Sequence, residues 1–170
     1  MAEIAVRKIL TGQQWTQPIP AGFNTLSAHI IVDDGSAAIE FYKKAFGAQE
    51  TMRLMSPDGK NLMHAQMKIG SSVLMLGGEF PPACLSPKSR GGSSVYLHIY
   101  TENADALFNR AVAAGCKINM PMSDTFWGDR YGQVEDPFGH QWSIATHQHD
   151  YTEEQIAANA KAYFAKMPKR

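Results

Sequence analysis

An internal repeat constrains the fold of this chain more than any other feature. Residues 26–47 read LSAHIIVDDGSAAIEFYKKAFG, and residues 95–115 read VYLHIYTENADALFNRAVAAG. Each segment begins with an apolar strand that carries a central histidine, and each continues through a polar break into an amphipathic helix closed by glycine. Three further strands, separated by turn signals, follow each helix. The sequence therefore predicts two βαβββ modules.

Local signals mark the ends of the predicted helices. Asp34 or Ser36 can cap the first helix, and Asn103 or Asp105 can cap the second. The segment 150–170 is expected to form a further helix that packs on the domain, because its apolar residues recur at helical spacing.

The repeat divides the chain into segments. The link at 77–94 is rich in Pro, Gly and Ser and is expected to be an irregular connection. The expected division is an N-terminal extension at 1–22, a domain at 23–149 with modules of about 23–78 and 93–149, and a C-terminal helix at 150–170.

Charge and cysteine content exclude several classes of partner. Sixteen Lys and Arg balance sixteen Asp and Glu, so no net field favours nucleic acid or an anionic membrane. The N-terminal residues contain no long apolar run, so neither a signal peptide nor a membrane span is expected. Cys84 and Cys116 form no paired motif, which predicts two free thiols and a reduced, cytoplasmic protein.

Several motifs together resemble a known family. The paired modules, the helix AIEFYKKAFGA and the turn EDPFGH resemble the glyoxalase/bleomycin-resistance group, the vicinal oxygen chelate superfamily. The segments MHAQMKIGSSVLML and DPFGHQWSIATH are most similar to its PhnB-like branch. The resemblance covers about residues 23–149. It implies an α+β fold in which the two modules form a curled mixed sheet around a cleft, with helices outside, and it implies a homodimer.

Alternation along the strands assigns side chains to the two faces of each sheet. The more apolar set, which includes Leu26 and Met63, is expected to lie under the helices. The side chains expected to line the cleft combine aromatic and hydrogen-bonding groups, which suits a small organic ligand. They are Ser27, His29, His64, Gln66, Met75, Tyr96, His98, Tyr100 and Ser143.

The repeat also relates the two modules residue by residue. It makes His29 equivalent to His98, and Gln66 equivalent to Glu135. A pseudo-twofold axis is expected to bring such pairs together from opposite walls of the cleft.

The resemblance raises the question of a metal. Metal-dependent members of the superfamily take one ligand from the first strand of each module and further ligands from the last strands. Counting from the helix motifs, the matching positions here are Ser27, Met75, Tyr96 and Ser143, and none is a usual ligand. No metal is therefore firmly predicted.

An alternative metal set remains open. A shift of two residues places His29 and His98 in the ligand role. With Glu135 they would form a two-histidine, one-carboxylate set suited to a divalent ion such as Zn, Mn, Fe or Ni. The other interpretation is that both histidines are neutral cleft residues that hydrogen-bond a ligand or a neighbour.

Four other polar residues have two interpretations each. Glu135 is a candidate general base, or it accepts backbone hydrogen bonds at the turn that follows it. Arg130 either pairs with an acidic ligand or forms a surface salt bridge. His140 is expected in a turn or at the surface. His147 forms an HxH pair with His149 that can bind metal adventitiously, or it lies at a solvated strand end.

These features support competing functions. The first is a metal-free protein that binds a small organic molecule, and the second is a metal-dependent lyase, isomerase or dioxygenase that uses His29, His98 and Glu135. A third is a scaffold that acts only through its dimer surface. PhnB-like proteins are often described as methyltransferase-like, but no glycine-rich nucleotide loop follows a strand in this chain, so methyl transfer is not expected.

Overall fold

The computed structural model describes residues 17–166, and the first predicted module is present in it. This module comprises β1 (Ala28–Val32), α2 (Gly35–Phe46), β2 (Gln49–Met55), β3 (Leu62–Ile69) and β4 (Ser72–Gly78). The strands lie in the order β1-β4-β3-β2, with β1 parallel to β4 and the other neighbours antiparallel. Most of the expected N-terminal extension, residues 1–22, lies outside the described residues.

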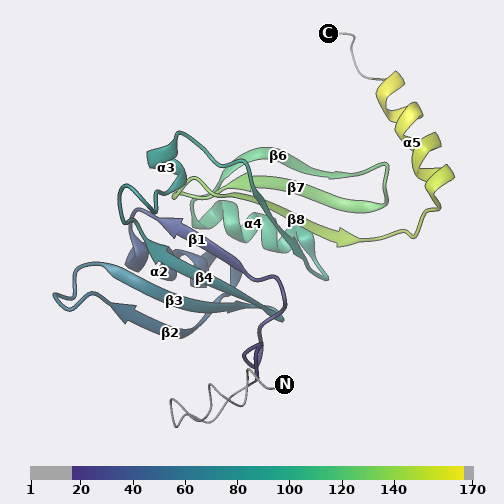
Figure 1. Cartoon of the computed structure of the whole chain (residues 1–170). Helices are drawn as coiled ribbons and strands as arrows, with labels where there is room; N and C mark the ends of the chain where they lie inside the picture. Colours follow the sequence, from purple (N-terminus) through teal and green to yellow (C-terminus); the bar gives the residue numbers. More distant parts are fainter. Residues whose placement is uncertain (1–16, 167–170) are drawn as a thin grey trace.

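The second module repeats this arrangement. It comprises β5 (Tyr96–Tyr100), α4 (Ala104–Ala114), β6 (Lys117–Asp124), β7 (Asp129–Glu135) and β8 (Gln141–His147). Its strand order is β5-β8-β7-β6, again with the first and last strands parallel. The predicted α+β fold of paired βαβββ modules is confirmed (Figure 1).

Two shorter elements complete the described part of the chain. The connection between the modules is not wholly irregular, because α3 (Pro87–Arg90) forms one helical turn in it. The C-terminal helix α5 (Glu153–Ala165) stands away from the two sheets and has no buried residue (Figure 1). It contacts the domain at Phe126, in the turn between β6 and β7, so the expected packing on the domain is limited to this turn. Among residues 17–166, no helix is long and apolar enough to cross a membrane.

The helices begin and end where the sequence signals them. The carboxylate of Asp34 accepts a hydrogen bond of 2.9 Å from the backbone N–H of Ala37, and the amide oxygen of Asn103 caps α4 in the same way. Gly47 ends α2 with φ of 67°, a backbone conformation that a side chain at this position would oppose. These caps set where each helix meets its sheet.

The two modules share one hydrophobic core on the helix-covered sides of their sheets. Helices α2 and α4 lie against each other, and the Arg110 side chain of α4 donates to backbone carbonyl oxygens at the end of α2. The rings of Phe46 on α2 and Trp142 on β8 lie with centroids 4.4 Å apart. Trp142 is only 2% exposed, so α2 of the first module packs directly on the second sheet.

A buried carboxylate joins the modules at the turn that precedes β8. Asp136 is 3% exposed, and its side chain accepts hydrogen bonds of 2.8 Å from both the Tyr42 hydroxyl of α2 and the Trp142 indole N–H. The same carboxylate accepts the backbone N–H groups of Phe138 and His140. These four donors satisfy both oxygens of the buried side chain, so Asp136 links the two modules by hydrogen bonds.

Two sequence expectations were wrong, and a third was right only in part. His140 does close the turn that begins at Asp136, but it is not at the surface: it is 8% exposed, and its Nε2 lies 2.9 Å from the carbonyl oxygen of Ile31 in the first module. Leu26 is 88% exposed because β1 begins only at Ala28. Met63 is 43% exposed and Leu62 is buried instead, because an irregularity in the β2–β3 pairing shifts the alternation by one residue.

The bridge from Tyr42 to Asp136 gives a first prediction. Tyr42→Phe removes one donor from a buried carboxylate and should lower the free energy of unfolding by about 1–3 kcal/mol. Chemical denaturation monitored by circular dichroism measures this change. Tyr163→Phe is the matched control: Tyr163 is 43% exposed, and its hydroxyl makes no hydrogen bond within residues 17–166, so its stability should be unchanged. Equal stability of the two variants would contradict the role given to Asp136.

Candidate functional site

Each sheet has an open face, which is the face opposite its helix. The strand register places equivalent residues in a row across each open face. In the first module the row is His29, Met75, Gln66 and Met52, and in the second it is His98, Ser143, Gln133 and Met120.

The rows confirm one sequence equivalence and correct another. His29 and His98 do occupy equivalent positions, but the partner of Gln66 in the repeat is Gln133 and not Glu135. A shift of two residues keeps every side chain on the same face, so alternation alone could not detect this error.

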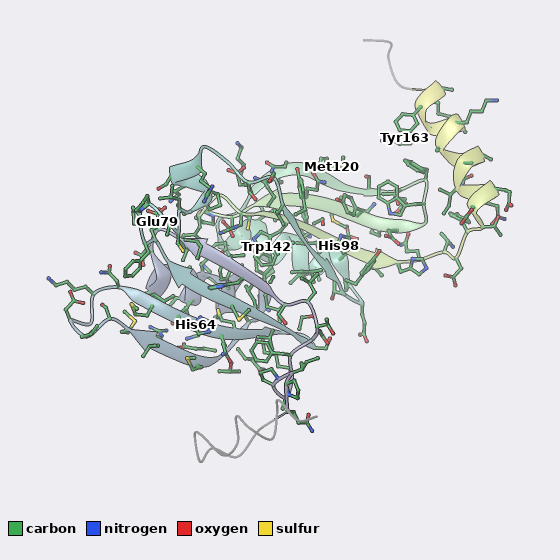
Figure 2. All side chains as sticks on the ribbon, viewed as in Figure 1. His64, Glu79, His98, Met120, Trp142 and Tyr163 are labelled. Atoms are coloured by element: carbon green, nitrogen blue, oxygen red, sulfur yellow. The ribbon has the colours of Figure 1, made fainter. Side chains whose placement is uncertain are left out.

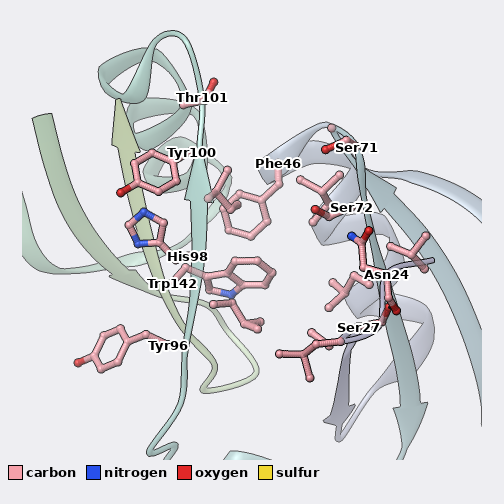
Figure 3. Close-up of a pocket in the computed structure, with 18 of the residues that line it drawn as sticks. Asn24, Ser27, Phe46, Ser71, Ser72, Tyr96, His98, Tyr100, Thr101 and Trp142 are labelled. Carbon is pink, nitrogen blue, oxygen red and sulfur yellow. The ribbon is translucent and has the colours of Figure 1, made fainter. Parts of the chain in front are cut away.

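The two open faces do not form a common cleft within one chain. Because the helix-covered faces meet in the shared core, the open faces point away from it. Figure 3 shows Tyr96, His98 and Tyr100 extending from β5 on the side away from Ser27 and Ser72 of the first module. His64 and His98 accordingly lie on different sheets (Figure 2).

A groove of about 800 Å³ does lie between the modules, and its walls are mostly apolar. Among the predicted site residues it is lined by Ser27, Tyr96, His98 and Tyr100. Phe46 and Trp142 from the core also contribute (Figure 3). The other predicted cleft residues belong to the open faces and not to this groove; they are His29, His64, Gln66, Met75 and Ser143.

His98 is the centre of the second open face. Its Nδ1 lies 2.8 Å from the hydroxyl oxygen of Ser143, which is itself 2% exposed. Its ring centroid lies 4.4 Å from that of Tyr100 and 6.0 Å from that of Tyr131. Burial lowers the pKa of His98, against an opposing effect of Asp129, so the imidazole is neutral at neutral pH. The result is a fixed, uncharged hydrogen-bonding group among aromatic rings.

The first open face is built more simply. The rings of His29 and His64 meet edge to face with centroids 5.6 Å apart, and the Gln66 side-chain nitrogen lies 3.5 Å from the His64 ring. Burial and the neighbouring His64 both lower the pKa of His29. His29 also lines a second hollow of about 400 Å³ beside the connection between the modules.

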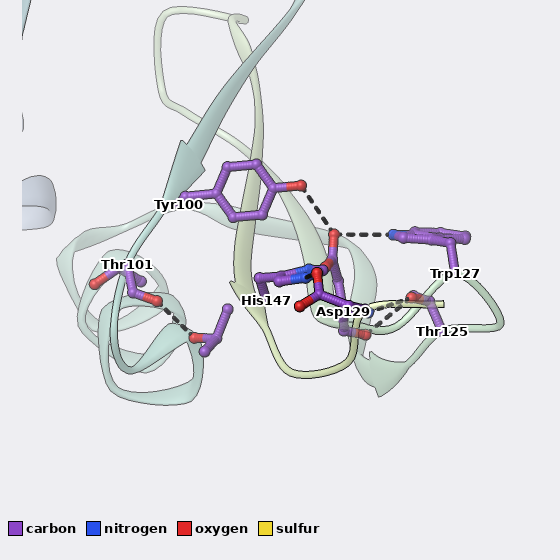
Figure 4. Close-up of polar contacts among 8 residues, drawn as sticks. Tyr100, Thr101, Thr125, Trp127, Asp129 and His147 are labelled. Carbon is purple, nitrogen blue, oxygen red and sulfur yellow. Dashed lines mark hydrogen bonds and ion pairs between the residues drawn. The ribbon is translucent and has the colours of Figure 1, made fainter. Parts of the chain in front are cut away.

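A buried carboxylate on β7 was not foreseen from the sequence. Asp129 is 3% exposed, and one of its oxygens accepts hydrogen bonds of 3.0 Å from both the Tyr100 hydroxyl and the Trp127 indole N–H (Figure 4). Its other oxygen lies 2.7 Å from Nδ1 of His147. Although burial opposes ionisation, these three donors lower the pKa of Asp129. The sequence did contain a signal for this group: alternation along β7 places Asp129 on the same face as Tyr131 and Gln133.

Glu135 has hydrogen-bonding partners on its own sheet. Its carboxylate accepts a 2.6 Å hydrogen bond from the Gln141 amide, whose oxygen in turn accepts from Asn119 at 2.5 Å. It is level with Gln141 and Tyr96, one row from His98. Its predicted catalytic role stays a prediction.

Within one chain, the predicted residues do not assemble a divalent-metal site. Ser27, Met75, Tyr96 and Ser143 offer hydroxyl groups and a thioether, and the Ser143 hydroxyl is already bonded to His98. The alternative set is also not assembled within one chain, since His29 and His98 lie on different sheets. In the part of the chain that the structure describes, no three His, Cys, Asp or Glu side chains are placed to hold an ion.

Arg130 and the cysteines have structural surroundings. The Arg130 guanidinium forms a two-bond contact with Asp105, at 2.8 and 2.9 Å, and a longer one with Asp124, so the salt-bridge interpretation is the correct one. Cys84 and Cys116 are unpaired, as predicted. Burial raises the pKa of the Cys116 thiol to about 12, which keeps it protonated.

The fold and these faces define a protein built from paired βαβββ modules with an open, polar and aromatic sheet face. A family model for the Glyoxalase/Bleomycin resistance protein/Dioxygenase superfamily matches residues 23–144, and the chain belongs to this family. An uncharacterised protein of Mycobacterium tuberculosis is 42% identical over 137 residues, which cover 78% of this chain and 80% of that protein.

Solved structures share the fold. TioX from a Micromonospora species is 25% identical, with a TM-score of 0.59 over 73% of this chain and 98% of TioX. A Bacillus cereus PhnB protein is 12% identical, with a TM-score of 0.56 over 72% of this chain and 99% of its own, so the PhnB-like branch is among the neighbours. FosX of Listeria monocytogenes, solved with Mn(II) and a dihydroxypropylphosphonic acid, is 17% identical. Its TM-score is 0.53, over 83% of this chain and 98% of FosX.

The histidines should titrate in a defined order. NMR titration of the imidazole resonances should give midpoints below 6.5 for His29 and His98, because the fold disfavours their charged forms. The midpoint of His147 should lie above 6.5, because hydrogen bonds to Asp150 and Asp129 favour its imidazolium. The His147 contacts therefore stabilise the fold fully below pH 6.5 and lose their effect as the pH rises through the raised pKa.

Asp150→Asn is the control for this order. It should lower the midpoint of His147 and leave that of His98 in place. A His98 midpoint above that of His147 would contradict the structure.

Proposed function

We propose that this protein binds a small organic ligand on the open face around His98, without a metal, and that the first module of a second copy closes the site. The observation that carries the proposal is the fixed pair of His98 and Ser143 among aromatic rings. A neutral imidazole and a nearly buried hydroxyl set the orientation of a ligand, and the rings supply contact area.

The predicted cleft residues divide between two roles in this proposal. His98, Ser143, Tyr96 and Tyr100 would contact the ligand from the second module. The facing row would come from the other copy and comprises His29, Met75 and Gln66, with His64 beside it. With Met52 this row is half apolar, and the pKa of its His29 is lowered, which suits the covering wall of an organic-ligand site.

Exposed apolar side chains on the open faces support the homodimer. Leu54 and Met52 on β2 are 55% and 38% exposed, and Met120 on β6 is 40% exposed. Each is paired in register with an open-face residue of the neighbouring strand. Exposed apolar side chains on one sheet face are typical of an interaction site, because covering them with another surface removes apolar area from water.

The remaining parts of the proposal concern the whole chain. Residues 23–149 form the binding domain. Two unpaired cysteines support a reducing compartment such as the cytoplasm. The balanced charge supports a small molecule as partner, with neither nucleic acid nor membrane.

A fragment screen tests ligand binding. Neutral organic fragments should raise the melting temperature of the full chain, and His98→Ala should weaken their binding about three- to tenfold through the lost hydrogen bond. His149→Ala is the matched control, because His149 is exposed and its ring stacks on that of Tyr151, which is not one of the proposed ligand-contacting residues. Equal affinity in the wild type and the His98 variant would overturn the assignment of the site.

Elemental analysis tests the metal-free part. Protein purified without added metal should hold no stoichiometric Zn, Mn, Fe or Ni. Stoichiometric metal that disappears in His98→Ala would instead favour a metal-dependent lyase, isomerase or dioxygenase with His29, His98 and Glu135 as ligands.

The homodimer gives a separate prediction. Light scattering after size exclusion should show a dimer for the wild-type chain and a monomer for Leu54→Glu, because the substitution places a charge on the open face. Ile19→Glu is the control, since Ile19 is 47% exposed and belongs to neither sheet. A wild-type monomer at all concentrations would contradict this part of the proposal.

A further inference from the structure

Four aromatic rings form a connected cluster at one end of the second open face. The ring of Tyr100 meets that of His98, His98 meets Tyr131 at 6.0 Å, and Tyr131 meets Trp127 at 5.5 Å and 77°. The circuit closes through Asp129, because the Tyr100 hydroxyl and the Trp127 indole donate to the same carboxylate oxygen (Figure 4). We call these four rings the aromatic cluster.

The strand register explains why the rings gather at this place. Tyr100 on β5 and Tyr131 on β7 are both paired with Ala145 on the strand between them. Because the Ala145 side chain is a single methyl group, the rings of Tyr100 and Tyr131 can occupy the space above it. The cluster is open to solvent on its outer side, since Tyr100 is 62% exposed.

The charge beside the cluster is negative. Asp129 is buried, and no Lys or Arg within residues 17–166 pairs with it. The adjacent Arg130 points to the other face of the strand and pairs with Asp105. His147 contacts Asp129, but it also contacts the carboxylate of Asp150, so the two acidic groups outnumber it. His98 adds no charge at neutral pH.

We infer that the aromatic cluster selects a ligand carrying an organic cation, such as an alkylated ammonium group. Electron-rich faces of Trp and Tyr attract such cations, and a buried carboxylate that accepts from the Tyr100 and Trp127 donors strengthens the negative potential of both rings. An anionic ligand meets no counter-charge here. This inference rests on the proposed function and names the charge class of its ligand.

Choline and its uncharged isostere 3,3-dimethyl-1-butanol separate charge from shape. In ¹⁵N NMR titrations of the full chain, choline should shift the Trp127 indole resonance and bind about tenfold more tightly than the isostere. Tyr100→Leu should abolish this preference. Phe80→Leu is the matched control: Phe80 lies in the connection between the modules, is 54% exposed, and should leave the preference intact.

A second variant guards against a loss of folding. Tyr100→Phe keeps the ring and removes only the hydroxyl, so it should retain a weakened preference for choline. Equal binding of choline and the isostere, or an equal loss in the Phe80 and Tyr100 variants, would overturn the inference. If uncharged fragments bind at His98 while choline does not bind, the proposed function stands and the cationic class fails.

Discussion

The carboxylate of Asp136 is the contact on which the arrangement of the modules depends. It is buried, and it joins the Tyr42 hydroxyl of α2 to the Trp142 indole of β8. Leaving any of these groups unpaired in the core would cost a substantial part of a stability that is small in total. The bridge therefore selects one orientation in which the helix-covered sides of the two sheets face a common core.

This orientation decides where a ligand can bind. Once the helix sides are joined, the polar and aromatic side chains of both sheets must face outward. A single chain then presents two half-sites and a mostly apolar groove between them. A second copy that brings an open face from each module together would turn these halves into one enclosed site, which is why the ligand proposal and the dimer proposal belong together.

The sequence predicted the fold well because the fold is repeated within it. Two matching strand and helix patterns, each with a glycine at the helix end, leave few arrangements of eight strands. The faces were also mostly predictable, since alternation is a local property. Alternation failed at Leu62 and Met63, where irregular pairing shifts one strand. The comparison of the two repeats equated Gln66 with Glu135, and alternation could not reveal this error because a two-residue shift preserves the face.

The candidate site was less predictable, because its contacts join residues that are distant in sequence. Tyr100, Trp127 and His147 reach Asp129 from one strand, one turn and the end of another strand. No spacing rule links them, and a single acidic residue in a strand more often signals an exposed face. Only the register shows that all of them meet beside His98.

Comparison of the two modules shows which half carries the specific chemistry. The row Tyr100, Ala145 and Tyr131 of the second module corresponds to Ile31, Gly77 and His64 in the first. The first module therefore keeps the central histidine but has an aliphatic side chain in place of Tyr100. This difference indicates that the second module forms the surface that recognises the ligand and the first module forms the surface that covers it. The second module holds the fixed polar pair, the rings and the buried charge, so selectivity should follow its residues, while substitutions in the first row should change affinity for all ligands alike.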